Sequence, residues 1–401
     1  MWGGPGAAAG QFNVPDGMSV DAMGHVYVAD RANYRIQKFS STGRLLAVWG
    51  GVPGNGLGDL STPYGVAADD YGFVYVADTS NNRIVKFTAA GRFVDEWGAA
   101  GGTGPKGSKN GEFNEPRGVA VDDRGNVYVA DHNNNRVQKL SPDGRFLARF
   151  GAHGGDGTAG SGDGEFDTPR GVAVDHEGNI FVAEKGNNRI QELDRNGRFI
   201  RKWGASGGDG TPGTDRGQFR LPYNVAIDPD GHLWVNDVLN NRVQEFSHTG
   251  RYLAAYGRNG GDGSPGVAPG EFDEPYGVAT DCRGNVYVSE EGNNRVQKLG
   301  LAGRPAPRCP PVLTARVAVV RRGTVTATVR CDRPCAARVS VAATGAASAH
   351  GAQRQVIPGA AERLRVRLPS SMAGASAAVT VTARGFAGPA RAVHRRVRLA
   401  R

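Results

Sequence analysis

A sixfold internal repeat constrains this chain more than any other feature of its sequence. Each copy contains an aromatic residue or Leu, two residues, Pro, one residue, Gly or Asn, an apolar run ending in Asp, and a V-Y-V-A-D-like segment. A polar turn, an N-N-R-V-Q-K-like segment and an aromatic-Gly pair follow. The repeat prolines and the turn arginines both step by 48 residues once and then by 53 four times. Two independent series with the same steps indicate repeated structural units.

Each repeat predicts four β-strands. In the third copy, residues 119–122, 126–131, 136–140 and 145–150 alternate or run apolar with many β-branched residues. Turns of hairpin length join them, which disfavours a linear β-solenoid. Four-stranded units around an axis form a propeller, and six lies within the usual range. We therefore expect an all-β, six-bladed β-propeller over residues 1–300, with blades near 12–50, 60–98, 113–151, 166–204, 219–257 and 272–300.

The sixth unit lacks an outer strand of its own. Aromatic residues end the other outer strands, but the next position in that series is Cys309, within a proline-rich segment. Trp2-Gly3 matches the aromatic-Gly signature, so we expect residues 1–4 to close the ring and remove exposed strand edges. Only Met1 precedes Trp2, and no secretion signal is visible. Either the closure is weak or the natural chain begins further upstream and carries that signal there, and we expect the second.

These repeats resemble the NHL-repeat family. The strongest matches are residues 116–122 (PRGVAVD), 125–131 (GNVYVAD) and 134–139 (NNRVQK), with near copies in the other units. The resemblance covers about residues 1–300 and implies the propeller fold, but it leaves the activity open. NHL propellers serve in RNA-binding and ubiquitin-ligase proteins of animals, in extracellular sensor parts of bacterial kinases, and in an amidating lyase.

One variable position of the repeat predicts a ligand-binding site. The residue after each repeat proline directly precedes the innermost strand, so we expect it at the mouth of the central channel. It varies while its Pro and Gly neighbours barely change, and Tyr and Arg are enriched at binding hot spots. We predict ligand contacts from Asp16, Tyr64, Arg117, Arg170, Tyr223 and Tyr276. The alternative is packing for the tyrosines and solvation for the arginines.

A second set of positions predicts structural ion pairs. An acid stands five residues before each repeat arginine, and a carboxylate and a guanidinium flanking a tight turn can pair across it. The pairs are Asp30–Arg35, Asp78–Arg83, Asp131–Arg136, Glu184–Arg189, Asp237–Arg242 and Glu290–Arg295. His132 breaks the local pattern and is a further candidate for ligand contact, with a solvated surface histidine as the alternative.

Long Gly-rich loops surround the same face at residues 99–112, 152–165, 205–218 and 258–271. Three of them contain Gly-Gly-Asp-Gly. Calcium needs several hard oxygen ligands, and each copy offers only one or two carboxylates. We therefore expect flexible surface loops and no cofactor, with calcium in the Gly-Asp loops as the alternative.

The sequence supports an enzymatic function less well than a binding function. The amidating lyase uses zinc held by three histidines, but the propeller histidines here do not converge under the predicted fold; they are His25, His132, His153, His176, His232 and His248. Lactonase-type propellers hold a metal with a set of acids and Asn that the innermost strands do not offer. We predict no metal site. A lyase or hydrolase built from His132, Glu184 and nearby arginines stays open.

Charge is divided between two parts of the chain. Residues 301–401 carry 18 Arg, no Lys and two acids, a net charge of +16, whereas residues 1–300 carry a net charge of −7. RNA binding requires a basic face. The propeller is acidic overall, so nucleic acid is disfavoured even though Arg and Tyr could stack bases. The four Cys lack the spacing of a zinc-binding domain, so the ubiquitin-ligase role has no support either.

The C-terminal residues 311–401 predict a small Ig-like antiparallel β-sandwich after a linker at 301–310. Residues 324–329, 338–341, 363–368 and 378–382 alternate in polarity, which gives one buried and one solvated face. The segment resembles β-sandwich modules appended to bacterial exported proteins. Cys331 and Cys335 can close a short disulfide, which would imply an oxidising compartment; Cys282 and Cys309 stay unassigned. The arginines fit an anionic surface such as wall polymers or lipid headgroups, with compositional bias as the alternative.

No apolar run in the sequence is long enough for a membrane-spanning helix.

The features of the sequence predict two alternative functions. The first function is an extracellular or cell-surface protein that binds a protein, glycan or other ligand at the propeller mouth. The second is a propeller lyase or hydrolase acting at that same mouth.

Overall fold

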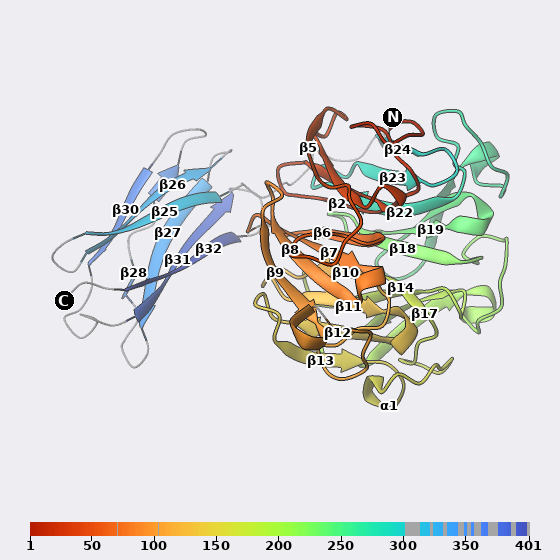
Figure 1. Ribbon diagram of the computed structural model, residues 1–401, viewed down its shortest axis with the longest axis horizontal. Helices are drawn as coiled ribbons and strands as arrows, with labels where there is room; N and C mark the ends of the chain where they lie inside the picture. The colour runs from red at the N-terminus through yellow and green to blue at the C-terminus, as the bar shows by residue number, and fades with distance from the viewer. Residues whose placement is uncertain are drawn as a thin grey trace. The chain divides into compact units, whose positions relative to one another are not determined.

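The computed structural model describes residues 1–300, apart from Asp70 and Thr103, and the backbone of eight strands within residues 301–401. The chain divides into two compact units, Met1–Pro305 and Ala306–Arg401. In its described part the first unit consists of six four-stranded antiparallel sheets, which form the predicted propeller (Figure 1). No helix in the described ranges is long and apolar enough to cross a membrane.

Each blade is a meander whose first strand lies beside the first strands of its neighbours. The strands of blades one to three are β2 (Pro15–Val20), β3 (Val26–Asp30), β4 (Arg35–Phe39), β5 (Leu45–Gly50), β6 (Pro63–Ala68), β7 (Phe73–Asp78), β8 (Arg83–Thr88), β9 (Phe93–Gly98), β10 (Pro116–Val121), β11 (Val127–Asp131), β12 (Arg136–Leu140) and β13 (Phe146–Phe150). Those of blades four to six are β14 (Pro169–Val174), β15 (Ile180–Glu184), β16 (Arg189–Leu193), β17 (Phe199–Gly204), β18 (Pro222–Ile227), β19 (Leu233–Asp237), β20 (Arg242–Phe246), β21 (Tyr252–Tyr256), β22 (Pro275–Thr280), β23 (Val286–Glu290) and β24 (Arg295–Leu299).

The N-terminus closes the ring, as predicted. The sixth sheet has the order β1-β24-β23-β22, and its outer strand β1 (Trp2–Gly3) pairs Trp2 with Val296 and Gly3 with Arg295. Figure 1 shows the red first segment beside β24 and β23 of the last blade. Because the outer strand comes from the other end of the chain, the first and last repeats belong to one closed structure.

The hydrophobic core lies between neighbouring blades. Tyr75 and Trp97 of blade two pack with Phe113, Val127 and Leu140 of the third repeat, and each of these side chains is at most 6% exposed. Burial of such large apolar side chains contributes roughly 1.5–3 kcal/mol each. Equivalent clusters stand between the other blades, so the alternating apolar residues seen in the sequence hold each blade against the next.

A glycine near the start of the first strand, present in every blade except the fifth, brings the channel-mouth residues together. A Cβ atom on Gly118 would overlap the carbonyl oxygen of Arg170, one blade further on. Gly65 stands in the same relation to Arg117, and Gly277 to Asp16. Only glycine permits this approach. The residues that follow the repeat prolines therefore lie side by side around the axis.

In the second unit, the backbone forms two antiparallel sheets. One has the order β25-β26-β30, and the other β28-β27-β31-β32, with β29 also paired to β27. Their bounds are β25 (Leu313–Val320), β26 (Thr324–Cys331), β27 (Cys335–Ala343), β28 (Ala349–His350), β29 (Arg354–Val356), β30 (Glu362–Arg367), β31 (Ser376–Gly385) and β32 (Ala390–Arg398). The predicted Ig-like packing and the predicted Cys331–Cys335 disulfide depend on side chains outside the described residues, and both stay predictions.

Candidate ligand-binding site at the channel mouth

Tyrosine and arginine side chains from neighbouring blades contact one another along the mouth. The guanidinium carbon of Arg117 lies 4.2 Å from the ring centroid of Tyr64, and that of Arg170 lies 3.9 Å from the ring centroid of Tyr223. The rings of Tyr223 and Tyr276 follow, with centroids 4.2 Å apart. Five of the six residues predicted from the repeat thus form direct contacts with their neighbours. The sixth, Asp16, is only 4% exposed and lies within electrostatic reach of both arginines.

Arg170 is buried, the side chain of Arg117 is 12% exposed, and both have donor groups left over. The Nε and Nη1 atoms of Arg117 and of Arg170 are shielded from solvent and have no hydrogen-bond partner among the described residues. Arg117 does donate from Nη2 to the Glu115 carboxylate at 2.9 Å. Burial, and next the neighbouring Arg117 charge, lower the pKa of Arg170 to about 10. Buried charged donors without partners are costly, which marks this position as unusual for a purely structural residue.

An acidic pair lies across the mouth from these arginines. Arg31 donates to the Glu291 carboxylate at 2.7 Å and to the Tyr64 hydroxyl at 2.9 Å, and its Nε is 3.6 Å from an oxygen of Asp16. Burial raises the pKa of Asp16 to about 6, with the positive charges of Arg31, Arg170 and Arg117 opposing the rise. Burial, together with the negative charge of Asp16, raises the pKa of Glu291 to about 8. Near neutral pH the pair therefore holds a proton.

His132 belongs to the arginine side of the site. It is 5% exposed, and its Nδ1 lies 3.1 Å from the carbonyl oxygen of Pro169. Burial, and then the charges of Arg117 and Arg170, lower its pKa to about 3, so the imidazole is neutral at physiological pH. The alternative of a solvated surface histidine is wrong. Burial, and then the positive charges of the same two arginines, lower the pKa of Lys185.

The sequence prediction missed Arg31, Lys185 and Glu291, although a signal for them was present. Each begins the turn between the second and third strands of its blade, immediately after the acid that ends the second strand. This position is also variable around the ring, and its residues are Arg31, Thr79, His132, Lys185, Val238 and Glu291. The criterion that selected the first ring of residues would have selected this second ring too.

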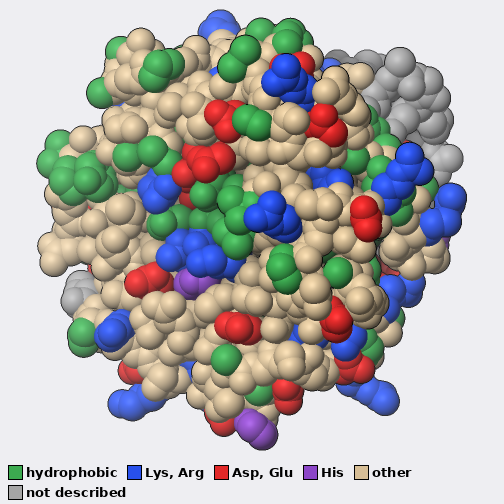
Figure 2. Space-filling view, turned by 90° about the vertical axis from the view of Figure 1, so that its right-hand side faces the viewer, with side chains coloured by type: hydrophobic (Ala, Val, Ile, Leu, Met, Phe, Trp, Pro, Cys, Tyr) green, Lys and Arg blue, Asp and Glu red, His purple; other side chains and the backbone are tan. Residues whose placement is uncertain are grey.

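The predicted residue types can be seen together on one face. Figure 2 shows a hollow at the centre of the visible face, where hydrophobic side chains lie between Lys or Arg side chains with a histidine on one side and Asp or Glu side chains on the other. An apolar floor with separate positive and negative groups can orient a ligand as well as hold it.

The six predicted turn pairs are all formed, and they hold the loops in place. Within each pair the arginine Nε lies 2.6–2.8 Å from a carboxylate oxygen. Arg136 shows the pattern, because its Nη atoms also donate to the backbone carbonyls of Ser108, Lys109 and Glu112 in the preceding loop. The pairs therefore tie each blade to the Gly-rich segment before it.

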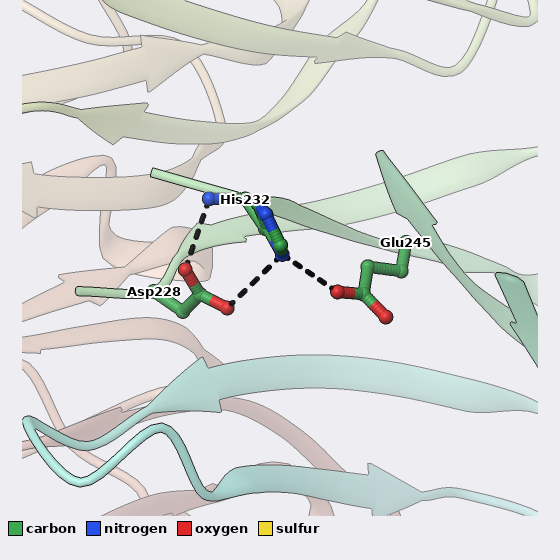
Figure 3. Close-up of side chains that lie close together, drawn as sticks. All are labelled: Asp228, His232 and Glu245. Carbon is green, nitrogen blue, oxygen red and sulfur yellow. Dashed lines mark hydrogen bonds and ion pairs between the residues drawn. The ribbon is translucent and has the colours of Figure 1, made fainter. Parts of the chain in front are cut away.

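One cluster on the opposite face resembles a metal site but is explained by its hydrogen bonds. Asp228, His232 and Glu245 come together in blade five, as Figure 3 shows. His232 Nδ1 lies 2.8 Å from Glu245, whose other oxygen accepts from Tyr256. The carboxylate of Asp228 accepts from the His232 backbone and from Trp234. All four carboxylate oxygens thus have partners, and we interpret the cluster as part of the turn.

The Gly-Asp loops use their aspartates locally. The carboxylates of Asp156, Asp209 and Asp262 each accept a bond at 2.8 Å from the backbone amide two residues later. Such turns stabilise a loop without an ion. Calcium at these loops stays a prediction.

Six radial sheets of four strands define a β-propeller, and the repeated blade identifies its class. Residues 12–39, 60–87, 113–140, 166–193 and 272–299 match the NHL repeat model. Five of the six units of the propeller are therefore NHL repeats. The fifth unit departs from the others at Asn224 and Asn236, which replace Gly and a small residue, yet its strands form the same sheet.

Comparisons with known proteins agree on the fold. The chain is 33% identical over 156 residues to "Protein brain tumor" of Drosophila melanogaster, covering 38% of this chain and 13% of that protein. It is 36% identical over 146 residues to "Peptidyl-glycine alpha-amidating monooxygenase A" of Xenopus laevis, covering 34% and 15%. A solved Bacteroides thetaiotaomicron protein of unknown function superposes with a TM-score of 0.56 at 14% identity, covering 74% of each chain. This chain thus spans only a small part of the two relatives' length.

Proposed function

We propose that this chain is a binding protein that holds a protein or glycan ligand at the mouth of its NHL propeller. One observation carries the proposal: around a single opening, two largely buried arginines with unused donors stack on tyrosines and face an acidic pair. Tyr and Arg supply much of the energy at binding hot spots. A ligand that supplied acceptors would offset the desolvation of these arginines, which the free protein leaves uncompensated.

Binding to defined glycan and peptide arrays tests this function. We expect the chain to recognise members of one array, and a variant with Tyr64, Arg117, Arg170, Tyr223 and Tyr276 all changed to Ala to lose that recognition. The matched control changes two exposed residues in turns of the opposite face, Arg124→Ala and Glu177→Ala, and should bind as the parent does. Thermal unfolding of each variant checks that it is folded. Equal binding by the folded five-residue variant would refute the proposal.

A second candidate function is a lyase or hydrolase acting at the same mouth. Two observations favour it: a buried carboxyl pair that retains a proton near neutral pH, and sequence similarity to a protein named for peptidylglycine amidation. Within the described ranges, however, no three histidines come together as a zinc centre requires. Turnover of a peptide ending in α-hydroxyglycine by the parent chain, abolished in Glu291→Gln, would establish this alternative over simple binding.

We further propose that the protein works outside the cytoplasm or at the cell surface, with its Arg-rich second unit held near an anionic polymer. The spacing of Cys331 and Cys335 supports a short disulfide, and disulfides persist mainly in oxidising compartments. The +16 charge of residues 301–401 supports attraction to an anionic surface. Co-sedimentation of the full chain with wall polymer, and its loss in high salt, tests the second part of this proposal.

A further inference from the structure

The two mouth arginines have more hydrogen-bonding capacity than the protein uses. Arg170 is 8% exposed, yet its Nε and Nη1 find no partner within the described residues, and the same atoms of Arg117 are equally unpaired. The faces of both guanidinium groups are covered by Tyr64 and Tyr223. The unpaired N–H edges of these arginines are the groups that bind anionic oxygens.

Charges around the arginines indicate how much negative charge the site accepts. Arg117 already donates a hydrogen bond to Glu115, and Arg31 donates one to Glu291. Asp16 lies within electrostatic reach of Arg117 and Arg170, but within the described residues neither arginine donates a hydrogen bond to it. Arg170 and Lys185 are left as the positive surplus. An anionic group on a ligand offsets this surplus.

We infer that Arg117 and Arg170 bind a carboxylate carried by the ligand, and that Asp16 competes with this carboxylate for the same two guanidinium groups. The inference rests on the proposed function and names the chemistry of its ligand. The adjoining rings of Tyr223 and Tyr276, at 4.2 Å, supply an apolar wall beside Arg170. An aromatic carboxylate presents both features and is a suitable probe.

Competition with Asp16 makes binding depend on pH. When the ligand occupies the arginines, Asp16 loses part of the attraction that keeps it ionised, and its pKa of about 6 rises further. Binding then takes up a proton, so affinity falls as pH rises from 5.5 to 8, while the ligand carboxylate stays ionised throughout. The charged and titratable groups that face Asp16 and the arginines are Arg31, Glu291, Glu274, Glu115, His132 and Lys185. His132 is neutral over this range.

A titration of the full chain with 4-fluorobenzoate, followed by ¹⁹F NMR, tests the inference. We expect saturable binding of 4-fluorobenzoate and about tenfold weaker binding of the uncharged 4-fluorobenzamide. Arg170→Gln should weaken benzoate binding about tenfold, whereas Arg145→Gln, an exposed arginine on the opposite face, should leave it unchanged. Acetate should displace the probe better than inorganic phosphate does.

Asp16→Asn provides an independent test that does not depend on the folding of the arginine variant. It should bind benzoate several-fold more tightly than the parent at pH 8 and should lose most of the pH dependence between 5.5 and 8. Equal affinity of the parent and Asp16→Asn at pH 8, or preferential displacement by phosphate, would overturn the inference.

The results also separate this inference from the proposed function. If array recognition requires the mouth residues but Arg170→Gln binds benzoate as the parent does, the carboxylate assignment fails and the proposed binding function stands. If benzoate binding needs Arg170 but array recognition survives the five-residue variant, the mouth holds a carboxylate and the proposed macromolecular function fails.

Discussion

The turn arginines and the mouth arginines lie on the same face of one ring, yet the protein treats them in opposite ways. Arg136 is fully buried, pairs with buried Asp131 and donates to three loop carbonyls. Arg170 is nearly as buried but leaves its Nε and Nη1 unpaired. The donors of the turn arginines form hydrogen bonds within the fold, so these arginines stabilise it. The mouth arginines keep unpaired donors, which only a ligand would provide with partners.

Regularity distinguishes the two groups as clearly as hydrogen bonding does. The turn pairs occur in all six blades with nearly the same geometry, as a structural need common to every blade requires. At the mouth the corresponding positions differ from blade to blade, and an acidic side faces a basic side. Variation at symmetric positions of a repeat breaks the symmetry of the surface, and an asymmetric surface is what a particular ligand requires.

The largest expected effect comes from removing a turn arginine. Arg136→Ala leaves the carboxylate of Asp131 buried without its ion partner and frees three loop carbonyls, so we expect a loss of about 3–5 kcal/mol in the free energy of unfolding. Arg170→Gln should cost less than about 1 kcal/mol, because it removes no hydrogen bond made among the described residues. Chemical unfolding followed by circular dichroism measures both. Equal losses of unfolding free energy in the two variants would mean that the turn and mouth arginines contribute alike to the stability of the fold.

A smaller effect of the mouth on stability should be visible through pH. The folded state holds His132 neutral with a pKa of about 3, whereas the unfolded chain has a pKa near 6.5. A depressed folded pKa means that the unfolded state binds more protons below pH 6.5. Stability therefore falls as the solution becomes more acidic, by about 2 kcal/mol between pH 7 and pH 5 for this group alone.

His132→Gln isolates that contribution. The variant keeps a side chain able to donate to the Pro169 carbonyl but does not titrate. The difference in unfolding free energy between parent and variant should change by about 2 kcal/mol from pH 7 to pH 5, with other groups cancelling in the subtraction. A difference that stays constant over this range would mean that the pKa of His132 is the same in the folded and unfolded protein, as it is for an exposed histidine.

The sequence could predict the fold because the features that determine it repeat. Strands, turn pairs and the closing segment at Trp2 all follow from residues that recur at a fixed spacing, and a recurring position is recognisable without coordinates. The site was predicted only in part. Arg31 and Glu291 reach the mouth from the turn after the second strand, and their contact with each other depends on closure between the first and last blades. No local pattern in the sequence reports that proximity. The burial of His132 likewise depends on its neighbour in the next blade.

The smallest expected effect comes from repairing an irregularity in the structural network itself. The residue before each turn arginine adopts the left-handed conformation, and in blade three it is Asn135, whose side-chain oxygen accepts the backbone amide of Thr168 in the next blade at 2.9 Å. Blade one has Tyr34 at this position, with φ of 54°. Asn tolerates this conformation better than Tyr does, and it could accept the amide of Thr62. We expect Tyr34→Asn to raise the free energy of unfolding by about 0.5–1 kcal/mol, and Asn135→Gly, which keeps the conformation but loses the bond, to lower it by a similar amount. A stabilising Tyr34→Asn with unchanged ligand binding would show that the structural network and the mouth can be altered separately; a loss of binding would show that they are one system.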